Sequence, residues 1–271
     1  MDALTPQLFA IFASLVEEAS GLHYGPGDRE LFEVKLASHA TEQGFETLLD
    51  FYYRLRYDDP TGAALGQLLE VLFVHESYFF RELPPLMAIV ETHLVPVIER
   101  RGRARVWSAA CAGGEEPLTL AMMLDAKGLL DRVEIVATDL SPAVLERARS
   151  GRYTRRALRD GHPGELAGRY LRSDAKGVTV EPRIREAVKF GLANLVADDC
   201  PVIGPFDAIL CRNVLIYFRD DQVLKVIARL TSRLAPDGLL AVGVSESLLR
   251  FGTQLACEER AGAFFYRSAG R

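Results

Sequence analysis

Apolar residues in the first part of the chain recur at the spacing of helices that bury one face. Leu8, Ile11, Phe12, Leu15 and Val16 follow this spacing, and Gly21 supplies a stop. Further helices are predicted over residues 28–40, 46–57 and 64–74, with a turn at DDPTG (58–62). The pair Pro84-Pro85 is expected to break the chain. We therefore predict a helical N-terminal domain over residues 1–85.

From residue 86 onward the pattern changes from helices alone to helices that alternate with strands. A helix is predicted over residues 86–101. Strand-like runs at 105–110 and 133–138 are followed by helical stretches at 118–127 and 142–149. Later strands are predicted at 187–190, 206–211 and 238–244, and a final one at 257–266 after a turn. The alternation is typical of an α/β fold with a parallel, doubly wound, Rossmann-like sheet, which we place over residues 86–271.

Residues 151–186 interrupt this alternation with short pieces such as GVTVEP. We predict an inserted helix and a small β-subdomain there. From Glu146 to Lys189 the sequence has 12 Lys and Arg against 6 Asp and Glu, a local charge of +6. That excess fits either an ordinary solvated surface or a docking face for an acidic partner, and the sequence leaves both open.

Composition excludes several classes of protein. A formal net charge of −5 gives no indication of nucleic acid or an anionic membrane as partner. No apolar run approaches the ~20 residues that span a bilayer, and the acidic start is not a secretory signal. Cys111, Cys200, Cys211 and Cys257 form no zinc-ligand pattern, so we predict no metal and expect buried free thiols. The expected location is the cytoplasm.

Four predicted strand ends carry polar residues, and in a doubly wound sheet ligands bind at such ends. The ends are the loop CAGGEE (111–116), Asp139, Asn194 and residues 211–213. The glycines of the loop are expected to let its backbone approach a ligand closely. Its two glutamates, with Asp139, would oppose a pyrophosphate, and no Gly-Lys-Ser/Thr sequence follows the glycines. S-adenosylmethionine (SAM) fits better, because it joins a ribose to a sulfonium and an ammonium.

Six sequence blocks together resemble the chemotaxis receptor methyltransferases (CheR) over nearly the whole chain. They are SYFFRE, WSAACAGGEEPLTLAM, ATDLS, ERARSGRY, FDAILCRNVLIYF and LAPDGLLAVGVSES. The resemblance implies SAM-dependent methylation of glutamate side chains on the cytoplasmic helices of chemoreceptors. Its products would be glutamate methyl esters and S-adenosylhomocysteine. The inserted β-subdomain of that family matches the interruption at 151–186.

The resemblance also implies a set of SAM contacts, carried over by matching motif. These are His75, Ser77, Arg81, Ala110, Glu116, Asp139, Asn194, Leu195, Cys211, Arg212 and Asn213. It places Tyr217 beside the transferred methyl group, and we expect Arg81 and Tyr217 to be catalytic. A glutamate with a pKa near ~4.3 is already ionised at neutral pH and needs no general base. Water exclusion and alignment should therefore suffice.

Some of these residues also have a purely structural interpretation. Arg81 could pair with Glu76 or Glu82 on a helix surface, and Tyr217 could be a core residue. Phe79 and Phe80 are expected to be core residues.

Two features depart from the better-known members of the family. Residues 28–59 hold Arg29, Lys35, Arg54 and Arg56 against eight acidic residues, whereas those members carry a basic helix there that faces the receptor. The segment RSDAKGVTVEP (172–182) is short for binding a receptor's C-terminal pentapeptide. We therefore predict pentapeptide-independent recognition. We also expect the protein to be a monomer.

Two other functions remain open. One is a SAM methyltransferase acting on a small molecule or RNA, which SYFFRE and the helical domain argue against. The other is a catalytically silent SAM-binding adaptor, which the retention of Arg81 and Tyr217 argues against.

Overall fold

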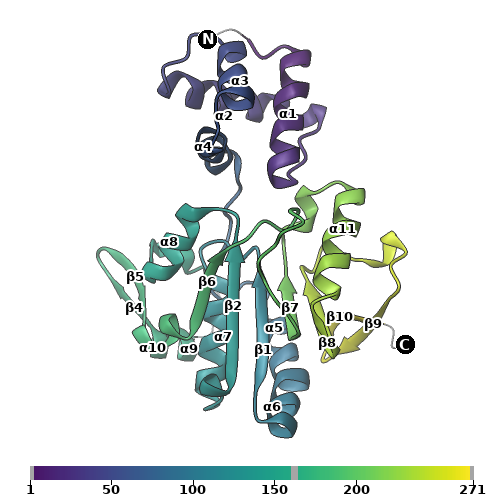
Figure 1. Ribbon diagram of the computed structural model, residues 1–271. Helices are drawn as coiled ribbons and strands as arrows, with labels where there is room; N and C mark the ends of the chain where they lie inside the picture. The colour runs from purple at the N-terminus through teal and green to yellow at the C-terminus, as the bar shows by residue number, and fades with distance from the viewer. Residues whose placement is uncertain (1–2, 160–163, 269–271) are drawn as a thin grey trace. The chain divides into compact units, whose positions relative to one another are not determined.

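Figure 1 shows the computed structural model of the chain, which describes residues 3–159 and 164–268. The chain divides into two compact units. The first comprises residues up to Val74 together with Tyr217–Gln222, and the second comprises the remainder. The sequence pattern places the division at residue 85 instead. The two divisions differ because Phe79 and Phe80, 1% and 7% exposed, belong to the core of the second unit; both are core residues, as expected.

Helices form the first unit, as the apolar spacing predicts. They are α1 (Pro6–Ser20), α2 (Arg29–Glu42), α3 (Leu48–Tyr57) and α4 (Ala63–Leu72). The hydroxyl of Thr5 accepts from the N–H of Leu8 and caps the start of α1, and Gly21 ends that helix in a left-handed conformation. Phe12, Phe32 and Phe51 are among the buried side chains of a core confined to residues 4–72.

A seven-stranded sheet organises the described part of the second unit. Its strands are β1 (Ala104–Ala109), β2 (Val133–Asp139), β6 (Val188–Leu192), β7 (Phe206–Cys211), β8 (Leu234–Val242), β9 (Leu255–Arg260) and β10 (Ala263–Ser268). Their order is β6-β2-β1-β7-β8-β10-β9. The first five are parallel and β10 is antiparallel to its neighbours. The chain runs outward from β1 to β6 and then returns to β7, so the predicted doubly wound order is confirmed.

Helices and short turns precede the sheet and connect its strands. They are α5 (Leu83–Ile89), the π-helical segment Val90–Leu94, α6 (Val95–Arg101), α7 (Glu115–Ala126), α8 (Pro142–Ser150) and α11 (Asp220–Thr231), with 3₁₀ turns at Leu130–Arg132, Leu215–Tyr217 and Leu249–Phe251. The apolar pattern did not lead to a prediction of α11, although Val223, Val226, Ile227 and Leu230 of this helix are buried.

Two details of the prediction were wrong. Pro84-Pro85 lies in the first turn of α5 and does not break the chain, because the N–H groups at a helix start have no intrahelical partner for a proline to remove. The predicted strand at 257–266 is a hairpin of β9 and β10, closed by Ala261 and Gly262 at φ 49° and 77°.

The insertion carries the predicted helix and small sheet; residues 160–163 lie outside the described ranges. Its elements are β3 (Arg152–Tyr153), the 3₁₀ turn Arg155–Ala157, α9 (Gly164–Tyr170), β4 (Leu171–Asp174), β5 (Gly177–Val180) and α10 (Pro182–Glu186). The sheet order is β3-β5-β4. Arg152, Thr179 and Arg172 stand opposite one another across it and are all exposed. The residues with basic side chains therefore share one outer face.

Across the described ranges, the helices are too short or too polar to traverse a bilayer.

Candidate functional site

The loops that follow β1, β2, β6 and β7 emerge at one edge of the sheet, because these strands are parallel. Among the described residues, six that are not glycine have positive φ, namely Phe80, Glu82, Ala110, Ala112, Asn213 and Ala261. All but Ala261 lie in the segments 75–82, 110–116 and 211–213. Such conformations cost on the order of 1–3 kcal/mol each and gather at functional sites. Backbone strain therefore marks these three segments.

The glycine loop after β1 is fixed by backbone bonds to the end of β2. The N–H of Cys111 donates to the carbonyl of Thr138 at 2.9 Å. A Cβ on Gly113 would lie 2.6 Å from a guanidinium nitrogen of Arg147, and one on Gly114, at φ +85°, would lie 2.9 Å from Ala148. A side chain at Gly114 would therefore clash with α8, and one at Gly113 would displace the guanidinium of Arg147. The close approach of this backbone to a ligand stays a prediction.

Asp139 ends β2 with its carboxylate directed at two loops. One oxygen accepts from the N–H of Ala112 at 2.8 Å and the other from the N–H of Ser141 at 3.0 Å. Burial raises the pKa of this carboxyl, while the two N–H groups and the nearby His75 oppose the rise. The carbonyl of Asp139 accepts from the N–H of Ala193 at 3.0 Å, one residue before Asn194.

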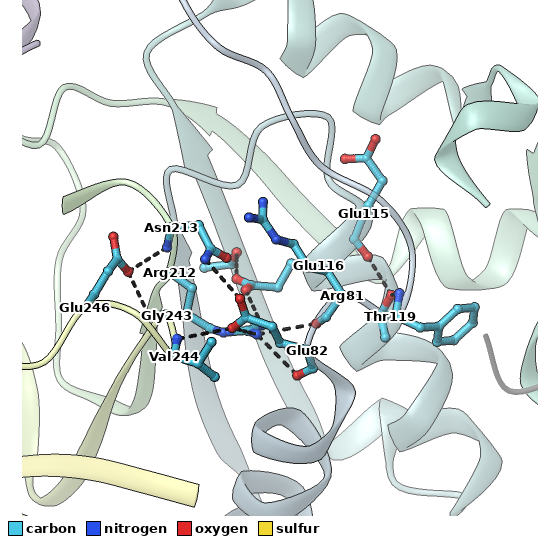
Figure 2. Close-up of polar contacts among 12 residues, drawn as sticks. Arg81, Glu82, Glu115, Glu116, Thr119, Arg212, Asn213, Gly243, Val244 and Glu246 are labelled. Atoms are coloured by element: carbon cyan, nitrogen blue, oxygen red, sulfur yellow. Dashed lines mark hydrogen bonds and ion pairs between the residues drawn. The ribbon is translucent and has the colours of Figure 1, made fainter. Parts of the chain in front are cut away.

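Arg212 lies at the centre of a buried charge cluster at the end of β7 (Figure 2). Its side chain is 2% exposed and donates to Oε2 of Glu116 and Oε2 of Glu82, both at 2.8 Å. The hydroxyl of Ser108 donates to the other oxygen of Glu116 at 2.8 Å. The cluster thus joins β1, the start of α7, the segment 75–82 and the end of β7.

Glu82 has further donors besides Arg212. The amide of Asn213 donates to its Oε1 at 3.1 Å, and the N–H of Val244 donates to its Oε2 at 3.3 Å. Burial alone would raise the pKa of the Glu82 carboxyl, but the Asn213 and Arg212 donors hold that pKa below its ordinary value. Glu82 is therefore held as a carboxylate.

Arg81 lies between two residues with left-handed backbones, Phe80 at φ 65° and Glu82 at φ 45°. The N–H of Phe80 donates to the hydroxyl of Thr119 at 3.1 Å. The guanidinium of Arg81 donates to the carbonyl of Glu76 at 2.7 Å. Residues 75–82 are not helical, so an ion pair on a helix surface does not describe Arg81.

Glu115, the first residue of α7, is 2% exposed. Burial raises the pKa of its carboxyl, and the charge of Arg147 and a hydrogen bond from Ser77 act against that rise. The hydroxyl of Tyr153, from the insertion, donates to the carbonyl of Gly113 at 2.7 Å. The insertion therefore contacts the glycine loop directly.

The structure brings most of the sequence-predicted site residues together in two sets. Arg212 joins Glu116 to Glu82, which also accepts from Asn213 and lies next to Arg81. His75, Asp139 and Asn194 gather at the ends of β2 and β6. The remaining predicted residues lie elsewhere. Ser77 contacts Glu115, Ala110 begins the strained loop at φ 58°, and Leu195 and Cys211 are buried. Tyr217 belongs to the first unit, where its carbonyl accepts from the N–H of His23 at 2.8 Å.

Glu82 and Glu246 belong to the site but were not predicted from the sequence. Oε2 of Glu246 accepts from the N–H groups of Gly243 at 2.7 Å and Asn213 at 2.6 Å, and its Oε1 from Ile216 at 3.2 Å. Both glutamates lie inside the family-like blocks, in SYFFRE and in GVSES. A residue-by-residue reading of the charges in those blocks could have found them.

The site fits SAM by its charge. In and next to the site loops, five acidic side chains (Glu82, Glu115, Glu116, Asp139 and Glu246) outnumber three guanidiniums (Arg81, Arg147 and Arg212), leaving aside Glu76, which pairs with the exposed Arg159. That excess of negative charge suits a sulfonium and an ammonium and disfavours a phosphate. In the described ranges, no group of three or more His, Cys, Asp or Glu side chains could hold a metal ion.

Fold and site together define a Rossmann-like SAM-dependent methyltransferase. The family model for the SAM-binding domain of CheR methyltransferases matches residues 75–261. Chemotaxis protein methyltransferase 1 of Pseudomonas aeruginosa is 33% identical over 251 residues, which cover 89% of this chain and 90% of that protein. The chemotaxis protein methyltransferase of Escherichia coli is 32% identical over 257 residues, 90% of this chain and 86% of that one. The chain therefore belongs to the CheR methyltransferase family.

Proposed function

We propose that the protein transfers the methyl group of SAM to glutamate side chains on the cytoplasmic helices of chemoreceptors. One observation carries the proposal: an acidic strand-end site, built around Glu116 and Asp139, in a chain whose relatives are named chemotaxis protein methyltransferases. The products are glutamate methyl esters and S-adenosylhomocysteine. The protein then acts in the cytoplasm, where those receptor helices lie.

Each site residue has a proposed role. SAM, when bound, supplies an activated methyl group on a sulfonium. The carboxylate of Asp139 accepts hydrogen bonds from ribose hydroxyls, and the acidic cluster around Glu116 favours the cationic end. His75, Ser77, Ala110, Asn194, Leu195 and residues 211–213 complete the pocket. Arg81 orients the incoming glutamate, and Tyr217 donates a hydrogen bond near the reacting atoms.

These roles need no general base in the protein. The substrate carboxylate is ionised at neutral pH because its pKa is near ~4.3. Its negative charge and the positive donor neutralise each other toward the transition state, so a site that excludes water and aligns the two groups is enough.

The partner is proposed to bind without a C-terminal pentapeptide tether, and the enzyme to act as a monomer. The short strands β4 and β5, Leu171–Asp174 and Gly177–Val180, support the first part because a four-residue strand offers little length for a bound peptide. Titration of the protein with a receptor pentapeptide by calorimetry tests it. Micromolar binding would contradict the proposal.

The function itself is tested by transfer of tritiated methyl groups from SAM to purified receptor cytoplasmic domains. We expect label that base releases as methanol, the signature of a carboxyl methyl ester. Absence of such label on every receptor, with SAM binding intact, would favour a silent SAM-binding adaptor. Asp139→Ala should weaken SAM binding by about 1–3 kcal/mol. Arg81→Ala and Tyr217→Phe should slow transfer with the fold intact.

A further inference from the structure

The backbone around Arg81 is strained on both sides. Phe80 and Glu82 both have left-handed φ values, 65° and 45°, which side chains other than glycine rarely adopt. A conformation of this kind persists when neighbouring groups hold it from several directions. The groups that hold it therefore determine where Arg81 points.

At Phe80 the left-handed backbone is fixed by hydrogen bonds between uncharged groups. Its N–H donates to the hydroxyl of Thr119 at 3.1 Å, and that hydroxyl in turn donates to the carbonyl of Glu115 at 2.7 Å. This chain of bonds ties the segment to the first turn of α7. It consists of neutral hydrogen bonds, which contribute less than bonds to ionised groups.

At Glu82 the left-handed backbone is fixed through the charged side chain, which accepts hydrogen bonds from groups at the ends of two strands (Figure 2). The Glu82 carboxylate accepts from Arg212 and Asn213, after β7, and from the N–H of Val244, after β8. Arg212 also donates to the carbonyls of Arg81 at 3.3 Å and Glu82 at 3.2 Å. Glu82 thus links the segment that carries Arg81 to the ends of β7 and β8.

We propose that Glu82 is a positioning residue for methyl transfer, which holds the strained backbone so that the guanidinium of Arg81 keeps its working direction. The inference rests on the role proposed above for Arg81. Glu82 acts through Arg81 and touches neither methyl donor nor acceptor. Arg212 serves the same purpose, since its guanidinium is taken up by Glu82, Glu116 and two backbone carbonyls.

The chemistry of the donors shows why a carboxylate is required. Both oxygens of Glu82 face N–H donors, so in Glu82→Gln the NH₂ group faces a donor in either orientation. Glu82→Gly removes the carboxylate and also relieves the left-handed backbone. The glycine variant should therefore fold while leaving the segment unheld.

The test is a double-mutant cycle on methyl transfer to a receptor cytoplasmic domain that accepts label. Variants are Arg81→Ala, Glu82→Gln, Glu82→Gly and the double variant Arg81→Ala/Glu82→Gln. We expect each Glu82 variant to lower kcat about 10- to 100-fold. The dissociation constant for SAM, measured by calorimetry, should stay within about threefold. In the Arg81→Ala background, Glu82→Gln should change kcat by less than about threefold.

Glu186→Gln is the matched control. The carboxylate of Glu186 also contacts an arginine, Arg185, at 3.1 Å, but its side chain is 69% exposed and lies on α10, outside the site loops. The variant loses the same charge without touching the contacts of Glu82 or Arg81. Its kcat should be that of the wild type, and its unfolding midpoint should show whether the loss of an exposed charge affects stability.

Each other outcome has a definite meaning. If the effects of Arg81→Ala and Glu82→Gln multiply, Glu82 acts independently and the inference is overturned while the role of Arg81 stands. If the Glu82 variants weaken SAM binding and leave kcat unchanged, Glu82 is a binding residue and the inference is again wrong. A wild-type rate for Arg81→Ala removes the role of Arg81, and the inference with it.

Discussion

Arginines occupy two contrasting settings in the second unit. The side chain of Arg212 is 2% exposed and its donors are taken up by Glu82, Glu116 and backbone carbonyls. Arg152 and Arg172 instead lie on the outer face of the small inserted sheet, exposed on either side of Thr179. The buried charge fixes the geometry of strand ends, whereas the exposed charges add to the field that a partner meets.

Replacing a buried and an exposed arginine in turn should give the largest difference in the free energy of unfolding. Arg212→Met leaves Glu82 and Glu116 without their shared guanidinium, so we expect a loss of about 3 kcal/mol in the free energy of unfolding. Urea denaturation followed by circular dichroism measures this. Arg172→Met is the control and should stay within about 0.5 kcal/mol of the wild type. Equal losses in the two variants would abolish the distinction.

The second-largest loss of stability is expected at Glu246, a buried acidic residue next to this cluster. In Glu246→Gln, the NH₂ group must face one of the backbone N–H donors of Gly243, Asn213 or Ile216. We expect a loss of about 2 kcal/mol in the free energy of unfolding. Glu186→Gln, where the exposed carboxylate pairs with Arg185, is the matched control and should change little. A neutral Glu246→Gln would mean that the loop rearranges without strain.

Acidification should weaken the buried cluster. The pKa of Glu82 is lowered in the folded protein: burial opposes this shift, but the Asn213 and Arg212 donors outweigh it. Its carboxylate therefore stabilises the fold above the ordinary glutamate pKa of ~4.3, and this contribution is lost as pH falls through the folded pKa.

At pH 6 we expect Glu82→Gln to be less stable than the wild type by about 1 kcal/mol. The gap should narrow as pH falls through the folded pKa of Glu82, which lies below its ordinary value, in urea denaturation at each pH. A gap that is independent of pH would show that the charge of Glu82 contributes nothing.

The smallest effect on stability is expected on the inserted sheet. The double variant Arg152→Glu/Arg172→Glu should unfold within about 0.5 kcal/mol of the wild type. If this face docks an acidic partner, KM for a receptor cytoplasmic domain rises, and its dependence on salt flattens. We expect that rise, with kcat unchanged. Wild-type KM at every salt concentration would leave the face as an ordinary solvated surface.

Local patterns in the sequence were sufficient for much of the fold. The spacing of Leu8 to Val16 predicts α1, and the strand-like runs predict β1, β2 and β7 with small errors at their ends. Strand ends with polar residues indicate where the site lies, because parallel strands bring those ends to one edge. The hairpin of β9 and β10 was missed because its turn, Ala261-Gly262, is only two residues long and follows charged residues, Glu258–Arg260, that do not favour a strand.

Local patterns in the sequence do not predict which residues far apart in the chain come into contact. Glu82 and Arg212 are 130 residues apart, and no local spacing relates them. The packing around Gly113 and Gly114 could not be predicted either, because it involves Arg147 and Ala148 of another helix. Periodicity reports which face of an element is buried, but not which charged partner it meets across the fold.

The first unit is assembled from two stretches of chain. Leu22 pairs with Phe218 as an isolated β-bridge, and the N–H of His23 donates to the carbonyl of Tyr217. Recombination between related genes at a single point near codon 74 would therefore separate these backbone partners. A chimaera that keeps these partners from the same parent must exchange residues 217–222 together with the N-terminal helices. The two stretches of the first unit are therefore expected to change together in evolution.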